Sequence, residues 1–134
     1  MGGGGAQIRC MVRAFKGEDI PISLTLLNSA GAAIAVESVD DVIIAIVHRQ
    51  SSKVISRFAL VSAEGYELIE TVDGPEGEIR VIVPRTATAS APDGEYSLQI
   101  KIKSDAEGYP DDASHRMGEY PGVFHLSPTK LTTA

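Results

Sequence analysis

The sequence predicts an all-β sandwich of about seven to eight short strands, and three of its features support this class. Residues 95–103 alternate between apolar and polar side chains, which is typical of a strand with one buried face. Similar alternating segments recur along the chain, with turn residues between them. No segment of helical length is amphipathic, so we expect strands to supply nearly all of the core. A closed β-barrel is the alternative architecture.

The clearest of these segments narrows the class further. Residues 91–94, Ala-Pro-Asp-Gly, form a turn signal because proline presets φ and glycine tolerates a positive φ. Tyr96 then begins the strand, and Leu98, Ile100 and Ile102 follow it on the same face. A tyrosine at a corner that leads into a late strand indicates an immunoglobulin-like antiparallel β-sandwich.

The other predicted strands are separated by turn and breaker residues. Asn-Ser-Ala-Gly at 28–31 and Asp-Gly-Pro-Glu-Gly at 73–77 are turns, and Pro84 ends a strand. Residues 85–91 are rich in Ala and Thr, and we expect one helical turn there, across the end of the sandwich. Besides 95–103, the expected strands cover residues 8–14, 20–26, 42–47, 54–60, 66–68, 79–83 and 120–126.

The length of 134 residues indicates a single domain. We expect residues 1–7 to be a flexible glycine-rich lead, residues 8–128 to form the domain and residues 129–134 to be a mobile tail. The chain has no Trp and only three Phe and four Tyr, so its core must be built mainly from Ile, Val and Leu.

Composition excludes several classes of function. A net charge of −6 opposes binding to the phosphate backbone of nucleic acids. No stretch approaches the roughly 20 apolar residues that span a bilayer, so we expect no membrane partner. The start of the chain lacks the features of a secretory signal. The single Cys10 cannot form an internal disulfide, which is expected for a chain that folds in a reducing cytosol.

The order of the turns and strands is informative as a set. Phe-Lys-Gly-Glu-Asp at 15–19 leads into an alternating strand, and Asn-Ser-Ala-Gly at 28–31 precedes a long hairpin. Gly-Pro-Glu-Gly-Glu-Ile at 74–79, Pro-Asp-Gly-Glu-Tyr at 92–96 and a closing segment at 118–128 then follow. This order resembles that of small immunoglobulin-like domains in bacteriophage and prophage tails, in particular the N-terminal domain of siphophage baseplate upper proteins.

The resemblance, which spans residues 12–128, implies a structural role rather than an enzymatic one. It implies an assembly module that docks on other phage tail or baseplate proteins through protein–protein contacts. It also implies a location in the virion tail, after synthesis in the cytoplasm of the bacterial host. We further expect the chain to form a homo-oligomer.

A surplus of apolar residues predicts where such contacts lie. The run at 42–47 is apolar at odd and even positions alike, so both faces of the strand are apolar. This predicts a central strand covered on both faces or a strand with a second contact surface. In other strands, some aliphatic residues are expected to point to the face opposite to that of the core residues. The candidate interface residues are Leu27, Ile43, Ala45, Val47, Ile69 and Ile82. Scattered exposed aliphatic residues without a function are the alternative.

A second functional class is a carbohydrate-binding or adhesion β-sandwich. Sugar platforms need exposed aromatic faces, and without Trp only tyrosines can provide them. The candidates are Tyr109 and Tyr120, in and after the polar segment that follows residue 103, together with Tyr66.

No cofactor, metal site or catalytic residue is predicted. The acidic loop 105–112 carries oxygen ligands of the kind that Ca²⁺ prefers, but their spacing does not match a calcium loop, so we expect a solvated loop. His48, His115 and His125 lie on separate elements, and we expect each at the surface or at a strand end.

Overall fold

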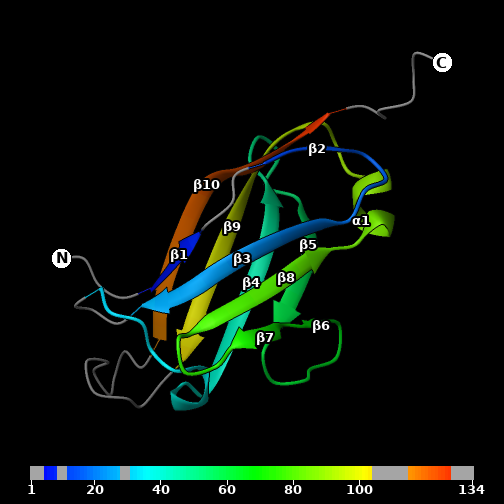
Figure 1. The fold of residues 1–134 in the computed structure, drawn as a ribbon. Helices are drawn as coiled ribbons and strands as arrows, with labels where there is room; N and C mark the ends of the chain where they lie inside the picture. Colours follow the sequence, from blue (N-terminus) through cyan, green and yellow to red (C-terminus); the bar gives the residue numbers. More distant parts are fainter. Residues whose placement is uncertain (1–4, 9–11, 28–30, 104–114, 128–134) are drawn as a thin grey trace.

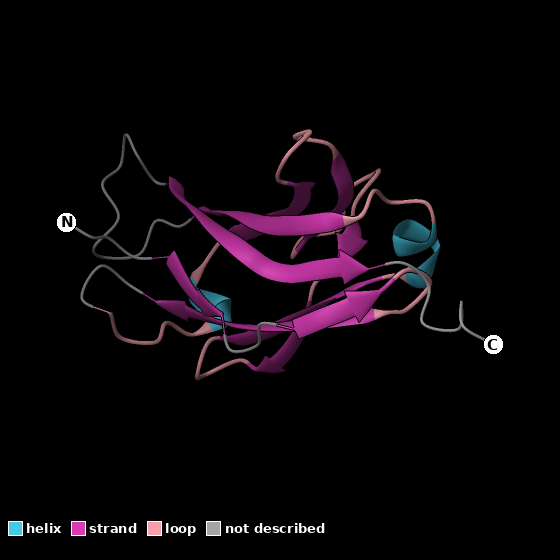
Figure 2. Cartoon of the chain, turned by 90° about the horizontal axis from the view of Figure 1, so that it is seen from above, coloured by secondary structure: helices cyan, strands magenta, loops and turns pink. Residues whose placement is uncertain are grey.

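Two β-sheets pack face to face in the computed structural model, which describes residues 5–8, 12–27, 31–103 and 115–127 (Figures 1 and 2). Ten strands lie within these residues. The side chains between the sheets form one continuous hydrophobic core. The predicted all-β sandwich is therefore confirmed.

The smaller sheet has four strands in the order β1-β3-β8-β7, and all of its pairs are antiparallel. Ile20, Ile22 and Leu24 point from β3 into the core, whereas Pro21 lies opposite Ile82 on the outer face. The strands of this sheet are β1 (Gly5–Ile8), β3 (Ile20–Leu27), β7 (Glu70–Asp73) and β8 (Glu78–Val83).

The larger sheet has six strands in the order β2-β10-β9-β4-β5-β6. The pairs β2/β10 and β5/β6 are parallel, in contrast to the wholly antiparallel sheet that was expected. The strands are β2 (Val12–Phe15), β4 (Asp41–His48), β5 (Val54–Ala59), β6 (Glu67–Leu68), β9 (Gly94–Lys103) and β10 (His115–Ser127). This division of strands between two sheets is that of an immunoglobulin-like domain.

The sequence did not reveal two places where the chain passes from one sheet to the other. The strand expected at 8–14 becomes β1, which pairs with β3, and β2, which pairs with β10. The strand expected at 66–68 becomes β6, and the chain continues through Ile69 into β7 in the other sheet. Alternation cannot show a change of sheet, because both sheets bury one face of every strand. With β1 and β2 as separate strands and β7 as an additional one, the described residues contain ten strands, more than the predicted seven to eight.

The central position predicted for residues 42–47 is confirmed. β4 lies between β9 and β5, and its Val42, Ile44 and Ile46 are completely buried. The core is largely aliphatic, as the composition predicts, and the largest of its fully buried side chains are Tyr96, Phe58 and Phe124.

Short helices lie at opposite ends of the sandwich (Figure 2). The 3₁₀ turn η1 (Val36–Ser38) lies at one end. The helix α1 (Arg85–Ala89) crosses the other end between β8 and β9, where a helical turn was expected. Gly77, in the turn before β8, has a φ of +73°, and a Cβ there would collide with the carbonyl oxygen of Ile34. Only glycine fits this turn.

Candidate functional site

The six residues predicted as an interface do not form a single surface. Val47 and Ile69 are only 7% and 6% exposed, so their side chains are not available to a partner and the expectation for them is corrected. Val47 follows a register shift in the pairing of β4 with β5, which breaks the alternation, and it lies opposite the buried Ser97. Ile69 lies between β6 and β7, where the chain passes from one sheet to the other. Leu27 is half-buried, and Ile82 is 43% exposed on the outer face of the smaller sheet.

The remaining two, Ile43 and Ala45, are half-buried on the outer face of the larger sheet. Lys101 of β9 lies opposite Ile43, and Ala45 lies between Gln99 of β9 and Arg57 of β5. Side chains that face each other across strands are in contact. The two apolar residues are therefore set among long polar side chains rather than within a broad apolar patch.

Four of the five exposed large apolar side chains among the described residues instead lie in one short segment of the chain, residues 61–72. Leu68 lies in β6, at the margin of the larger sheet, and Val72 lies in β7, at the margin of the smaller sheet. Val61 and Tyr66 precede them in the connection from β5 (Figure 1). Their exposed fractions are 54% for Val61, 37% for Tyr66, 64% for Leu68 and 53% for Val72. We call these four residues the edge surface.

Carboxylates are interspersed along the same segment. Glu64, Glu67, Asp73 and Glu76 are all exposed. Two carboxylates of this segment have partners: Oε1 of Glu70 accepts hydrogen bonds of 2.9 and 2.7 Å from the guanidinium of Arg80, and Oδ1 of Asp73 accepts one of 3.3 Å from the Glu76 amide. This segment thus carries exposed apolar side chains and exposed carboxylates together, which favours a partner with apolar and positively charged groups.

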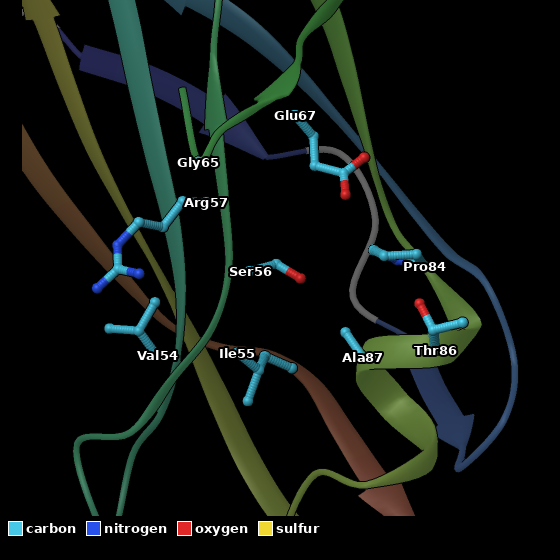
Figure 3. A pocket seen from close by; sticks show the side chains of 9 residues that line it. All are labelled: Val54, Ile55, Ser56, Arg57, Gly65, Glu67, Pro84, Thr86 and Ala87. Carbon is cyan, nitrogen blue, oxygen red and sulfur yellow. The ribbon is translucent and has the colours of Figure 1, made fainter. Parts of the chain in front are cut away.

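A groove opens beside the edge surface, between β5 and α1 (Figure 3). Its volume is about 310 Å³, which lies at the lower end of the range for ligand pockets, roughly 300–1,000 Å³. The side chains of Ser56 and Glu67 point toward the groove, whereas Arg57 points away from α1. Its lining residues are Val54, Ile55, Ser56, Arg57, Gly65, Glu67, Pro84, Thr86 and Ala87.

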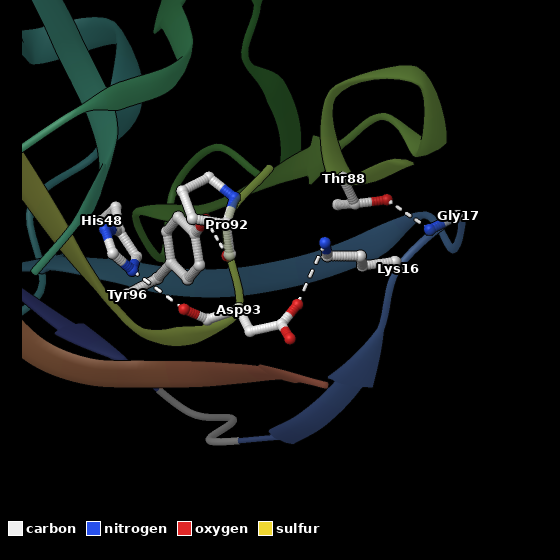
Figure 4. A network of polar contacts seen from close by, with 7 residues as sticks. All are labelled: Lys16, Gly17, His48, Thr88, Pro92, Asp93 and Tyr96. Atoms are coloured by element: carbon white, nitrogen blue, oxygen red, sulfur yellow. Dashed lines mark hydrogen bonds and ion pairs between the residues drawn. The ribbon is translucent and has the colours of Figure 1, made fainter. Parts of the chain in front are cut away.

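The helical wall of this groove is anchored to the turn that follows β2. The Thr88 hydroxyl accepts a hydrogen bond from the Gly17 amide at 3.1 Å and lies 2.9 Å from the Glu18 carbonyl oxygen, to which it donates (Figure 4). The Arg85 amide donates to the Asp19 carboxylate at 2.7 Å. Since Thr88 is completely buried, these bonds hold α1 in a fixed place relative to the sheets.

The corner that the sequence predicts at Tyr96 is built as expected. The Tyr96 hydroxyl donates to the carbonyl oxygen of Pro92 at 2.5 Å (Figure 4). The Tyr96 ring stacks on Phe124 with centroids 4.8 Å apart. Burial, followed by the negative charge of Asp93, raises the pKa of Tyr96 to about 12. Lys16 forms an ion pair with the same Asp93 at 3.0 Å.

His48 joins the corner to the tip of the neighbouring hairpin. The Ser51 amide and hydroxyl donate to Nδ1 at 3.2 and 2.6 Å, so the ring carries its proton on Nε2 and donates it to the Asp93 carbonyl oxygen at 2.9 Å. The Lys53 amide donates to the Ser51 hydroxyl at 3.3 Å. His48 is 5% exposed, so it lies at a strand end as predicted but not at the surface. The contact between Ser51 and His48 therefore closes the turn that follows β4.

The residues proposed for a sugar or cation site are described only in part. Tyr109 and the acidic loop 105–112 lie outside the described residues. The backbone of Tyr120 lies in β10 opposite Leu98, but its side chain is not among those described. Within the described ranges, no three His, Cys, Asp or Glu residues lie close enough together to hold a metal ion.

Among the helices that the structure describes, none combines the length and the apolar character of a membrane span. Neither a scan against protein-family models nor a search of curated proteins finds a match for this chain.

Proposed function

We propose that this domain is a non-enzymatic structural module of a phage or prophage tail or baseplate, which acts by docking on neighbouring proteins. The edge surface is the observation that carries the docking role. Four large apolar side chains within one twelve-residue segment, residues 61–72, leave apolar area in water that a partner would cover. The identity of the assembly rests on the order of turns and strands, which resembles that of tail domains.

The charges around the edge surface bear on the kind of partner. Two copies that associated through this segment would each contribute exposed carboxylates such as Glu64, and like charges in contact oppose association. We therefore expect the edge surface to contact a different protein. The predicted homo-oligomer would then use another face, and light scattering on the purified chain over a range of concentrations tests for it.

The experiment uses phage or prophage particles from a host that encodes the chain. An antibody against the chain should detect it in purified tails. Leu68→Asp should prevent its incorporation, because a charge replaces the most exposed of the large apolar side chains that the structure describes. Ile82→Asp is the matched control, since Ile82 is also exposed but lies on the outer face of the smaller sheet. Urea unfolding verifies that both variants fold.

Two results would count against the proposal. One is the absence of the chain from purified particles. The other is equal incorporation of Leu68→Asp and the parent chain, which would remove the edge surface from the docking role. The carbohydrate-binding alternative stays a prediction, and its tests are glycan-array binding that is lost in Tyr109→Ala or in Tyr66→Ala.

A further inference from the structure

β5 has an open edge that the rest of the larger sheet does not cover. On one side it pairs with β4, with a register shift that leaves Ile55 out of the pairing, and on the other side β6 pairs only with Phe58 and Ala59. Within the described residues, the segment from Val54 to Arg57 therefore has no neighbouring strand on its outer side. Such a segment presents backbone amides and carbonyls to any strand that approaches.

The register of β5 shows which backbone groups point outward. The Leu60 amide donates to the Val42 carbonyl oxygen, and the Ile69 amide donates to the Ala59 carbonyl oxygen. Alternate residues of an antiparallel pair bond to the partner strand, so the amide of Arg57 points away from β4, as the carbonyl of Ala59 does. The open segment is four residues long, which corresponds to about 13 Å of extended chain.

The groove described above lies directly along this open segment. Val54 to Arg57 form one wall, and Pro84, Thr86 and Ala87 of the α1 region form the other (Figure 3). A sheet edge that faces a helix across a groove can receive an extended peptide, which gains hydrogen bonds from the edge and side-chain contacts from the groove. β6 already pairs with the end of the same edge of β5, at Phe58 and Ala59, so a strand added along Val54–Arg57 would lie in line with β6.

The charge inside the groove indicates what the peptide carries. Glu67 lies opposite Phe58, which faces the core, so its side chain is directed to the same side, into the space between β5 and α1 (Figure 3). Its carboxylate makes no hydrogen bond or ion pair with the described part of the chain. The only lining cation, Arg57, points away from the groove. A basic side chain would complement this carboxylate.

We propose that the groove between β5 and α1 binds an extended segment of a partner protein by strand addition to Val54–Arg57, with a Lys or Arg of that segment paired with Glu67. An apolar side chain two residues away would contact Ile55 and Ala87, because alternate residues of a strand point to the same side. A second copy of this chain fits less well, since its exposed margin strand β7 carries Glu70 and Asp73.

This inference adds to the proposed function the chemistry of the partner, an extended segment with a basic residue. It rests on the proposed function only for the identity of the assembly. The probe is the peptide acetyl-Thr-Val-Thr-Lys-Thr-amide, titrated into the full ¹⁵N-labelled chain and followed by amide chemical shifts. We expect shifts concentrated at residues 54–57 and 67. The same peptide with an N-methylated central residue should bind at least about threefold more weakly, because it loses an edge hydrogen bond.

Substitutions at Glu67 test the charge. Glu67→Gln should weaken binding of the lysine peptide about threefold, which is the size expected for an exposed ion pair. Glu67→Lys should reverse the preference, so that a peptide with Glu in place of Lys binds better. Glu64→Gln is the matched control, because Glu64 is an exposed carboxylate of the same connection that does not line the groove.

Shifts that map to the outer face of the larger sheet, or binding that is unaffected by both Glu67 substitutions, would overturn the inference. The absence of any shift at millimolar peptide would do the same. These outcomes are separate from those of the assembly test. Peptide binding without incorporation into tails refutes only the proposed assembly, and incorporation without peptide binding refutes only the groove.

Discussion

The corner around Tyr96 and the edge surface lie in the same sandwich, but they differ in whether their polar groups have hydrogen-bond partners and their apolar side chains are buried. At the corner, Tyr96 is completely buried and its hydroxyl bonds to the chain, as both ring nitrogens of the adjacent His48 do. At the edge surface, Leu68 is 64% exposed, and the carboxylate of the adjacent Glu67 makes no bond within the described residues. The corner thus stabilises the fold, while the edge surface leaves area and charge for another molecule.

The largest expected effect separates the two regions by stability. Tyr96→Ala should lower the free energy of unfolding by about 3–5 kcal/mol, because it leaves a cavity beside Phe124 and His48. Leu68→Ala should change it by less than about 0.5 kcal/mol, since most of that side chain is already in water. Urea unfolding of both variants measures the difference, and similar losses would show that the edge surface supports the fold.

A smaller effect isolates the hydroxyl of the corner. Tyr96→Phe keeps the ring stack but removes the donor to the Pro92 carbonyl oxygen, so we expect a loss of about 1–2 kcal/mol. Chemical denaturation at neutral pH measures it. A variant as stable as the parent would mean that water replaces the lost bond at no cost.

The same hydroxyl predicts a dependence on alkaline pH. The pKa of Tyr96 is raised to about 12 in the folded chain, above the ordinary value of about 10 for tyrosine. The folded state therefore favours the neutral phenol, so this contribution is complete below pH 10 and is lost as the pH rises through 12. Denaturation midpoints between pH 9 and pH 12 should fall more steeply in the parent chain than in Tyr96→Phe. Parallel curves would contradict the assignment.

The smallest effect concerns a residue of the same strand that lacks a partner. Ser97 is 1% exposed, and its hydroxyl has no hydrogen-bond partner among the residues described. Ser97→Ala should therefore leave stability unchanged or raise it by about 1 kcal/mol, in contrast to Tyr96→Phe. Thermal unfolding of the two variants side by side is sufficient, and a clear loss in Ser97→Ala would reveal a bond that the described residues do not contain.

Local sequence predicted the corner correctly because both of its signals are short in range. The turn at 91–94 depends on proline and glycine, and the alternation from Tyr96 to Ile102 depends on neighbours two residues apart. The same alternation placed Gln99, Lys101 and Lys103 on the exposed face, where they are found. It placed Ser97 there as well, but Ser97 lies opposite the irregular stretch between Tyr120 and Phe124 of β10 and is buried.

The edge surface and the groove could not be predicted in this way. The apolar spacing of Tyr66 and Leu68 indicated a strand, but exposure depends on whether another strand covers it. The expected interface at Val47 and Ile69 was misplaced for the same reason. Nothing in the sequence distinguishes Glu67 from the other glutamates, because its place in the groove follows from the pairing of β6 with β5.

Alternation, turn residues and composition thus determined the all-β class, the aliphatic core and the corner at Tyr96, because each depends on neighbours along the chain. The tertiary structure decided that β1 and β7 join one sheet whereas β2 and β6 join the other, and so which sheet margins stay open. That choice depends on contacts between residues far apart in sequence, such as Ala59 with Leu68 and Arg85 with Asp19. Period-two patterning is the same for either sheet and does not encode it.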